Sequence, residues 1–215
     1  MSQITEKNIK CAHCGKESEQ TVIISTSAFG SMDLDTRPPM MARGLLPFEV
    51  QECPHCHYCD VSIADASVNS DTFPSDYLVI AHDSKYPELA RRYYLAALLH
   101  SAKEDIYGAG IMYLKAAWAC DDLHQAELSK AFRKKSAENL LNHTVETGDG
   151  DAAVMLVDVL RRAEEFSEAD QILQNVKEAM EDDENGFINK ILDFEGRLIE
   201  AKDSKCHTVG EIEDE

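Results

Sequence analysis

The stretch Cys53-Pro-His-Cys56, together with Cys11-Ala-His-Cys14, decides how the N-terminal part of this chain folds. Each is a Cys-x-x-Cys knuckle, in which the two intervening residues form a tight turn that aims both sulfurs at one point. Thirty-eight residues separate the knuckles, enough for two short strands and a Pro-rich connection. Two knuckles supply the four thiolates of a tetrahedral site with no open position. The spacing therefore predicts one structural zinc ion, held by Cys11, Cys14, Cys53 and Cys56.

Two other interpretations of the second knuckle stay open. Cys-Pro-His-Cys is also the active-site pattern of strongly oxidising thiol oxidases, where the histidine lowers the pKa of the thiol. Those enzymes need a long helix after the second cysteine, whereas residues 57–63 have the character of a strand. Cys59 continues the spacing, so it could replace a knuckle cysteine as a ligand or serve as a redox thiol. On a strand, such a cysteine is more often a small buried side chain.

Residues 1–65 have the composition of a small β module. They hold five of the seven cysteines and four of the six prolines. Strands are predicted at 21–25 and 45–52 because β-branched and apolar residues fit a pleated surface, and Pro47 favours an edge position for the second. Residues 66–84 are predicted to be a linker, with a short helix after Pro74. We expect a zinc-ribbon-like module at 1–65.

From about residue 86 the apolar residues recur with a helical period. Pro87 suits the first turn of a helix, and the stretch Gly148-Asp-Gly150 suits the end of one. Small residues recur in two helix pairs at an offset of sixty, which resembles tetratricopeptide hairpins, although the closing proline of such units is missing. An irregular hairpin bundle is the alternative. After the helix that follows Pro87, further helices are predicted at 104–121, 124–147, 151–164, 167–182 and 187–202.

These elements predict an α+β protein: the zinc-ribbon-like β module is followed by an all-α, tetratricopeptide-like hairpin bundle at 85–203 and an acidic tail at 204–215. The first twenty residues are polar, and the longest apolar run, residues 93–99, is too short to span a bilayer. We therefore expect a cytoplasmic protein that does not enter a membrane.

The charge balance argues against nucleic-acid binding. The chain of 215 residues carries 40 acidic and 21 basic residues, for a formal net charge of −19. Phosphate-backbone binding depends on lysine and arginine side chains that displace counterions, and this surface opposes it. The partner expected from composition is therefore a protein or peptide, and no nucleic acid.

No catalytic constellation is recognisable. A phosphate-binding glycine loop, a His-Glu-x-x-His zinc motif and a Gly-x-Ser-x-Gly nucleophile motif are all absent from the sequence. Asp33, Asp35 and Arg37 form a candidate ligand-binding loop. The alternative is an Asx-type turn with a salt bridge that fixes the crossover, since loop aspartates commonly bond their own backbone.

The chain resembles an uncharacterised bacterial family, a domain of unknown function that joins an N-terminal paired-knuckle domain to tetratricopeptide-like helices. The resemblance covers about residues 5–200. It implies the architecture and a prokaryotic cytoplasmic setting, and supplies no activity. One departure is His57, where a glycine commonly closes the second knuckle. The residues that carry the resemblance are Cys11-x-x-Cys14-Gly15, Phe29-Gly30, Asp33-Leu34-Asp35-x-Arg37-Pro38, Gln51-Glu52-Cys53-Pro54-x-Cys56 and Lys115-Ala-Ala-Trp118.

The expected function is that of a zinc-stabilised interaction or scaffold protein rather than an enzyme. The first alternative is a zinc- or thiol-based sensor that uses Cys53, Cys56 and Cys59. The second is an enzyme with an unrecognised pocket.

Overall fold

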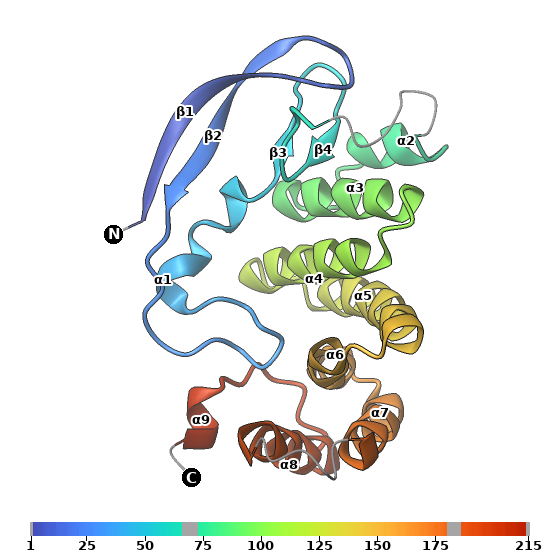
Figure 1. The fold of residues 1–215 in the computed structure, drawn as a ribbon. Coiled ribbons are helices and arrows are strands. Elements are labelled where there is room, and N and C mark those ends of the chain that lie inside the picture. The colour runs from blue at the N-terminus through green and yellow to red at the C-terminus, as the bar shows by residue number, and fades with distance from the viewer. Residues whose placement is uncertain (1, 66–72, 180–185, 214–215) are drawn as a thin grey trace.

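The computed structural model describes residues 2–65, 73–179 and 186–213. A small antiparallel β part lies at one end of a stack of helices (Figure 1), which confirms the predicted α+β fold class. Parts of three predicted segments lie outside the described residues: 66–72 of the linker, 180–182 of the helix at 167–182, and 214–215 of the tail.

The first two strands form a long hairpin. Strand β1 (Gln3–Lys10) pairs antiparallel with β2 (Glu17–Ser25), from Ile4 opposite Ile23 to Lys10 opposite Glu17. The predicted strand at 21–25 is confirmed, and it begins earlier than predicted. Strand β1 was not predicted, because its charged and polar residues are largely exposed on both faces and give no apolar alternation.

The prediction of a strand at 45–52 is wrong for most of its length. Residues Leu46–Phe48 form a 3₁₀ helix, η1, and the only part that pairs as a strand is β3 (Gln51–Glu52), opposite β4 (Cys59–Asp60). Pro47 explains the difference: its ring fixes φ near the helical value, and it has no N–H to give to a sheet. The Tyr93 hydroxyl then holds the turn by donating a 2.6 Å hydrogen bond to the Leu46 carbonyl.

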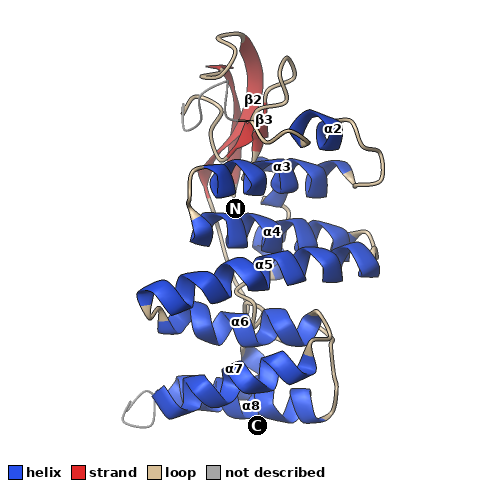
Figure 2. Ribbon diagram, turned by 90° about the vertical axis from the view of Figure 1, so that its right-hand side faces the viewer, coloured by secondary structure: helices blue, strands red, loops and turns tan. Residues whose placement is uncertain are grey.

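The predicted helices are confirmed, with ends that differ by one or two residues wherever the end is described. Helices α3 to α8 stack in the order of the sequence, each packing on the next (Figures 1 and 2). The short helix predicted after Pro74 is α2. The helices are α1 (Met40–Arg43), α2 (Tyr77–Ala81), α3 (Glu88–Ala102), α4 (Ile106–Asp122), α5 (Ala126–Thr147), α6 (Gly150–Arg162), α7 (Phe166–Ala179), α8 (Gly186–Glu200) and α9 (Gly210–Glu213).

Local sequence fixes several helix ends. Asp105 caps α4 by accepting from the Gly108 N–H at 2.9 Å, and Asp149 caps α6 by accepting from the Ala152 N–H at 3.1 Å. Gly148 ends α5 in the left-handed region, with φ 72°. Caps of this kind favour the short turns before α4 and between α5 and α6.

A long connection, residues 26–39, leaves the hairpin and runs along the helices (Figure 1). We call it the strap. It reaches α6 and α8, where Leu34 packs against Phe194, Leu198 and Ile212. The chain after α8 returns to meet it: Leu34 N–H donates to His207 O at 3.0 Å, and Val209 N–H donates to Met32 O at 2.9 Å. Part of the predicted acidic tail is therefore folded against the strap.

One hydrophobic core runs from the β part into the helices. Buried Cys11, Cys53 and Ile63 belong to the same cluster as the inner side chains of α3 to α8. Among the described helices, none combines the length and the apolar character needed to cross a bilayer.

Candidate metal centre

The first knuckle forms the turn between β1 and β2. Cys11 N–H donates to Lys16 O at 2.8 Å, and Gly15 N–H donates to Cys11 O at 2.8 Å. Gly15 has φ 73°, a conformation that costs glycine nothing and closes the turn. Both cysteines are thereby held on one side of the turn.

The second knuckle, between β3 and β4, has the same hydrogen bonds. Cys53 N–H donates to Tyr58 O at 2.9 Å, and His57 N–H donates to Cys53 O at 2.9 Å. His57 takes the place of Gly15 and has φ 61°, so a non-glycine residue adopts the left-handed conformation. Its imidazole Nδ1 lies 2.7 Å from Glu52 Oε1. The knuckle is thus formed despite the histidine, and that contact helps to hold the strained residue.

The four predicted sulfurs converge on one point. Their Sγ atoms all lie within 4.8 Å of one another, with Cys11 Sγ 3.8 Å from Cys56 Sγ and Cys14 Sγ 3.6 Å from Cys53 Sγ. A tetrahedral ion with metal–sulfur bonds of about 2.3 Å needs sulfurs about 3.8 Å apart. Each close pair joins one knuckle to the other, so an ion here would cross-link the two hairpins. The residues fit a metal site of four thiolates.

The surroundings act differently on the four thiols. Burial raises the pKa of Cys11 and of Cys56. Burial also acts to raise the pKa of Cys14, but hydrogen bonds from the Lys16 backbone and from the other sulfurs outweigh it, and this pKa is lowered. Thiols packed this closely gain from a cation that displaces their protons.

The neighbouring histidines do not join the cysteine group. His13 is stacked on Phe73, with ring centroids 4.3 Å apart, and His55 Nε2 lies 3.3 Å from Glu17 O. Within the described residues, the four cysteines are the one group of three or more histidine, cysteine or acidic side chains placed to share an ion.

Cys59 lies on β4 outside that group. Its side chain is fully buried, and its backbone N–H donates to the Tyr77 hydroxyl at 3.1 Å. Burial, followed by the charge of Glu52, raises the pKa of this thiol well above its ordinary value. Because the thiolate is the reactive form, burial and the raised pKa both disfavour reaction at Cys59.

The structure places Asp33, Asp35 and Arg37 against the helices, each with its own partner. Asp33 accepts from Arg43, while Arg37 Nη2 contacts both carboxylate oxygens of Asp122 at 2.7 Å. Asp35 accepts from Arg37 N–H at 3.3 Å, as in an Asx turn. Asp33 and Arg37 line two different cavities, and Asp35 lines neither of them.

Asp35 is completely buried and is the centre of an ion-pair cluster. It accepts from Arg162 Nη1 at 2.6 Å and Trp118 Nε1 at 2.9 Å, and lies 3.3 Å from Arg133 Nη2. Burial opposes its ionisation, but the two guanidiniums outweigh it and hold the pKa of Asp35 below its ordinary value. Sequence reasoning missed both arginines, since neither carries a motif.

No family model matches the sequence, and neither the curated proteins nor the solved structures contain a match to it. What the structure shares with the architecture of the resembled bacterial family is coarse: a small two-stranded sheet with a cysteine cluster, followed by helices.

Proposed function

We propose that this chain is a zinc-stabilised interaction or scaffold protein that works in the cytoplasm. The observation that carries the proposal is the convergence of the four knuckle sulfurs, with Cys11 paired to Cys56 and Cys14 to Cys53. Thiolates are soft ligands that favour zinc among the common divalent ions. Four protein ligands leave no position for substrate or water, so the zinc is structural.

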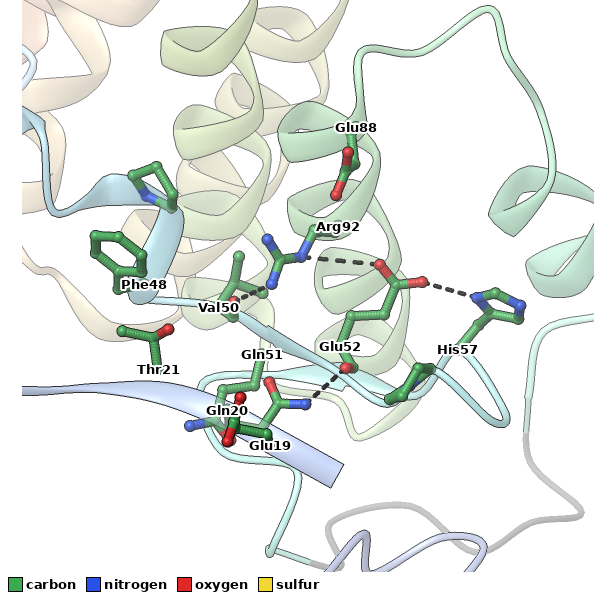
Figure 3. Close-up of a pocket in the computed structure, with 12 residues that line it drawn as sticks. Glu19, Gln20, Thr21, Phe48, Val50, Gln51, Glu52, His57, Glu88 and Arg92 are labelled. Atoms are coloured by element: carbon green, nitrogen blue, oxygen red, sulfur yellow. Dashed lines mark hydrogen bonds and ion pairs between the residues drawn. The ribbon is translucent and has the colours of Figure 1, made fainter. Parts of the chain in front are cut away.

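The zinc would fix the β part as a platform on α3. The hairpins bury few apolar side chains of their own, and zinc supplies the stability that such a small module lacks. Polar contacts from α3 then attach the platform, among them Tyr93 to Leu46 O, Arg92 Nη2 to Val50 O at 3.1 Å (Figure 3), and Lys103 Nζ to Asp60 at 2.7 Å.

The partner would be a protein with a basic or mixed surface. The chain carries a net charge of −19, and complementary charge steers association and suppresses wrong partners. An enzyme is not favoured, because the convergent side chains described above are four cysteines that saturate one ion. A thiol sensor is not favoured either, because Cys59 is buried and its pKa is raised.

Elemental analysis of the purified protein tests the zinc directly. We expect about one zinc per chain, from the single site of four thiolates. Cys14→Ser and Cys56→Ser should each lower the zinc content at least tenfold after dialysis against a weak chelator, because a hydroxyl is a poor zinc ligand. Cys206→Ser is the matched control, since Cys206 is exposed and lies outside the group of four. Full zinc occupancy in both knuckle variants would refute the site.

The interaction half of the proposal needs a separate measurement. Affinity purification with the zinc-loaded chain should recover a protein whose binding weakens as salt rises, since charge steers the contact. An unrelated protein of the same net charge serves as the bait control. Recovery of the same proteins by both baits would mean that the acidity alone attracts them.

A further inference from the structure

Two buried carboxylates meet where α6 packs on α8. Asp158 lies on α6 and Glu195 on α8, and each residue is only 1% exposed. We call them the carboxyl pair. One oxygen of each accepts from Arg161, whose Nε lies 2.7 Å from Glu195 Oε2 and whose Nη2 donates to Asp158 Oδ1. Arg161 is itself completely buried, so a single guanidinium serves two carboxylates in a part of the core from which solvent is excluded.

The second oxygen of each carboxylate has no donor. Asp158 Oδ2 and Glu195 Oε1 are both buried, and neither has a hydrogen-bond partner among the described residues. The two side chains nevertheless lie within hydrogen-bonding reach of each other. Two acceptor oxygens can form a hydrogen bond only when a proton lies between them. An ionised pair would instead leave two buried acceptors unsatisfied, and their charges would repel each other.

The neighbouring ion-pair cluster has no cation to spare for the carboxyl pair. Arg162 lies 2.6 Å from Asp35 of the strap and 2.9 Å from Asp121 of α4. Arg133 of α5 contacts the same two carboxylates, so two guanidiniums and two carboxylates balance each other there. The charges of Arg162 and Asp35 act in opposite directions on the pKa of Asp158.

The other elements that pack on α6 and α8 leave Arg161 as the one cation in contact with the carboxyl pair among the described residues. The chain after α8 supplies backbone carbonyls, since Arg161 Nη1 donates to Asp203 O at 2.5 Å and to Lys205 O at 2.9 Å. The Lys205 side chain is exposed, and His207 contacts the carboxylates of Asp203 and Glu211. The buried side chains of α7, which packs on both helices, are apolar: Ala169, Leu173 and Val176.

Burial and mutual repulsion both favour a protonated form of the pair. Burial, followed by the charge of Asp158, raises the pKa of Glu195 to about 9. Burial also raises the pKa of Asp158, against the attraction of Arg161. Two carboxyl groups that share one site and one counter-ion do not both ionise readily, and their proton belongs to the pair rather than to either residue.

We propose that Asp158 and Glu195 hold one proton between them at neutral pH, which makes the contact between α6 and α8 sensitive to pH. The shared proton satisfies both free oxygens and leaves one negative charge opposite Arg161. The same guanidinium binds the carbonyls of Asp203 and Lys205, so the anchor of the segment after α8 adjoins the proton site. This inference is independent of the zinc proposal, because none of the groups that it uses is a thiol.

Urea unfolding of the zinc-loaded wild type and of Glu195→Gln, between about pH 6 and pH 8.5, tests the shared proton. The glutamine amide can donate to Asp158 Oδ2 while its carbonyl accepts from Arg161, so the variant imitates the protonated pair. A raised folded-state pKa gives stability that is complete below the unfolded value of about 4.3 and is lost as pH rises to the folded value. The unfolding constant of the wild type, divided by that of the variant, should therefore rise about tenfold per pH unit. The four knuckle thiols are common to both proteins and cancel in the ratio.

Asp193→Asn is the matched control, because Asp193 lies on the same helix and is 65% exposed. Its ratio to the wild type should stay constant with pH. A constant ratio for Glu195→Gln, or the same rise for Asp193→Asn, would overturn the proposal.

Infrared spectroscopy of the folded wild type gives a readout that does not depend on the stability of a variant. The carbonyl band of a protonated carboxyl should be present at pH 7 and should disappear as the pH is raised past about 9. Absence of that band at pH 7 would overturn the proposal even if Glu195→Gln fails to fold.

Discussion

Trp118 and Asp35 are joined across 83 residues of sequence: the indole Nε1 on α4 donates a 2.9 Å hydrogen bond to the carboxylate in the strap. Both side chains are buried, at 3% and 0% exposure. Arg133 from α5 and Arg162 from α6 reach the same carboxylate. One side chain of the strap therefore binds three consecutive helices of the stack.

Asp35→Ala should destabilise the fold by about 3 kcal/mol, because the buried Arg133 and Arg162 keep only the partly exposed Asp121 as a shared counter-ion and the Trp118 N–H loses its acceptor. The free energy of unfolding in urea measures the effect. Asp193→Ala is the matched control, since that carboxylate is 65% exposed and pairs with Lys177 on the surface. It should cost less than about 1 kcal/mol. Equal losses in the two variants would show that the strap contact is not a buried ion pair.

Removal of zinc should unfold the two knuckle hairpins while most of the helix survives. The reason is a difference in burial: β1 and β2 are largely exposed and have few apolar contacts of their own, whereas α4 to α8 bury continuous apolar faces. Far-UV circular dichroism with a strong chelator should retain most of the helical signal, and limited proteolysis should cut first within residues 3–25. Loss of nearly all helical signal would show that the helices depend on the metal.

The contact between β4 and α3 should make stability depend on pH. On α3, His100 Nε2 lies 3.3 Å from Asp60 Oδ1 and His100 Nδ1 lies 2.6 Å from Asp105 Oδ2. Lys103 forms an ion pair with the same Asp60 carboxylate. The hydrogen bond to Asp60, together with that to Asp105, raises the pKa of His100 despite burial and despite Lys103. A raised folded-state pKa gives stability that is complete below the unfolded value of about 6.5 and is lost as pH rises through the folded value.

The comparison of wild type with His100→Asn measures this contribution. The difference in the free energy of unfolding between the two proteins should be largest near pH 6 and should shrink towards pH 8.5. Asp60 and Asp105 have lowered pKa values and stay ionised throughout this range. Their titration therefore does not alter the direction in which the difference changes with pH. A difference that is constant over the range would mean that His100 is not charged in the folded protein.

The sequence predicts what is periodic or motif-based. The helices could be predicted because apolar residues recur along them, and the four cysteines because their spacing suits one ion. The ion-pair cluster around Asp35 could not be predicted, because Asp35 and Arg162 lie 127 residues apart and only the fold brings them together. Three residues that follow helix ends have a left-handed backbone conformation: Glu104, His124 and Glu164. They could not be predicted because none of them is a glycine. The positions of Glu19 and Glu88 in the sequence likewise could not show that both side chains line one pocket (Figure 3).

The chain is predicted not to bind nucleic acid, and its β part has few free cations that could contact phosphates. Of the five basic residues before residue 63, Arg37 and Arg43 are committed to Asp122 and Asp33. Only the lysines of the first hairpin are left, and they are exposed. Three cations are fewer than the roughly six to ten phosphate contacts that tight binding requires.

Fluorescence anisotropy with labelled duplex and single-stranded probes at about 0.15 M salt decides the matter, because weak charge attraction is largely screened at that ionic strength. We expect no saturable binding at micromolar protein, for either DNA or RNA. Any weak signal at low salt should vanish in a variant with Lys7, Lys10 and Lys16 changed to alanine, since these three side chains are the free cations of the hairpin. Micromolar or tighter binding at about 0.15 M salt would instead place nucleic acid among the partners, because it would require a cationic surface formed by other residues.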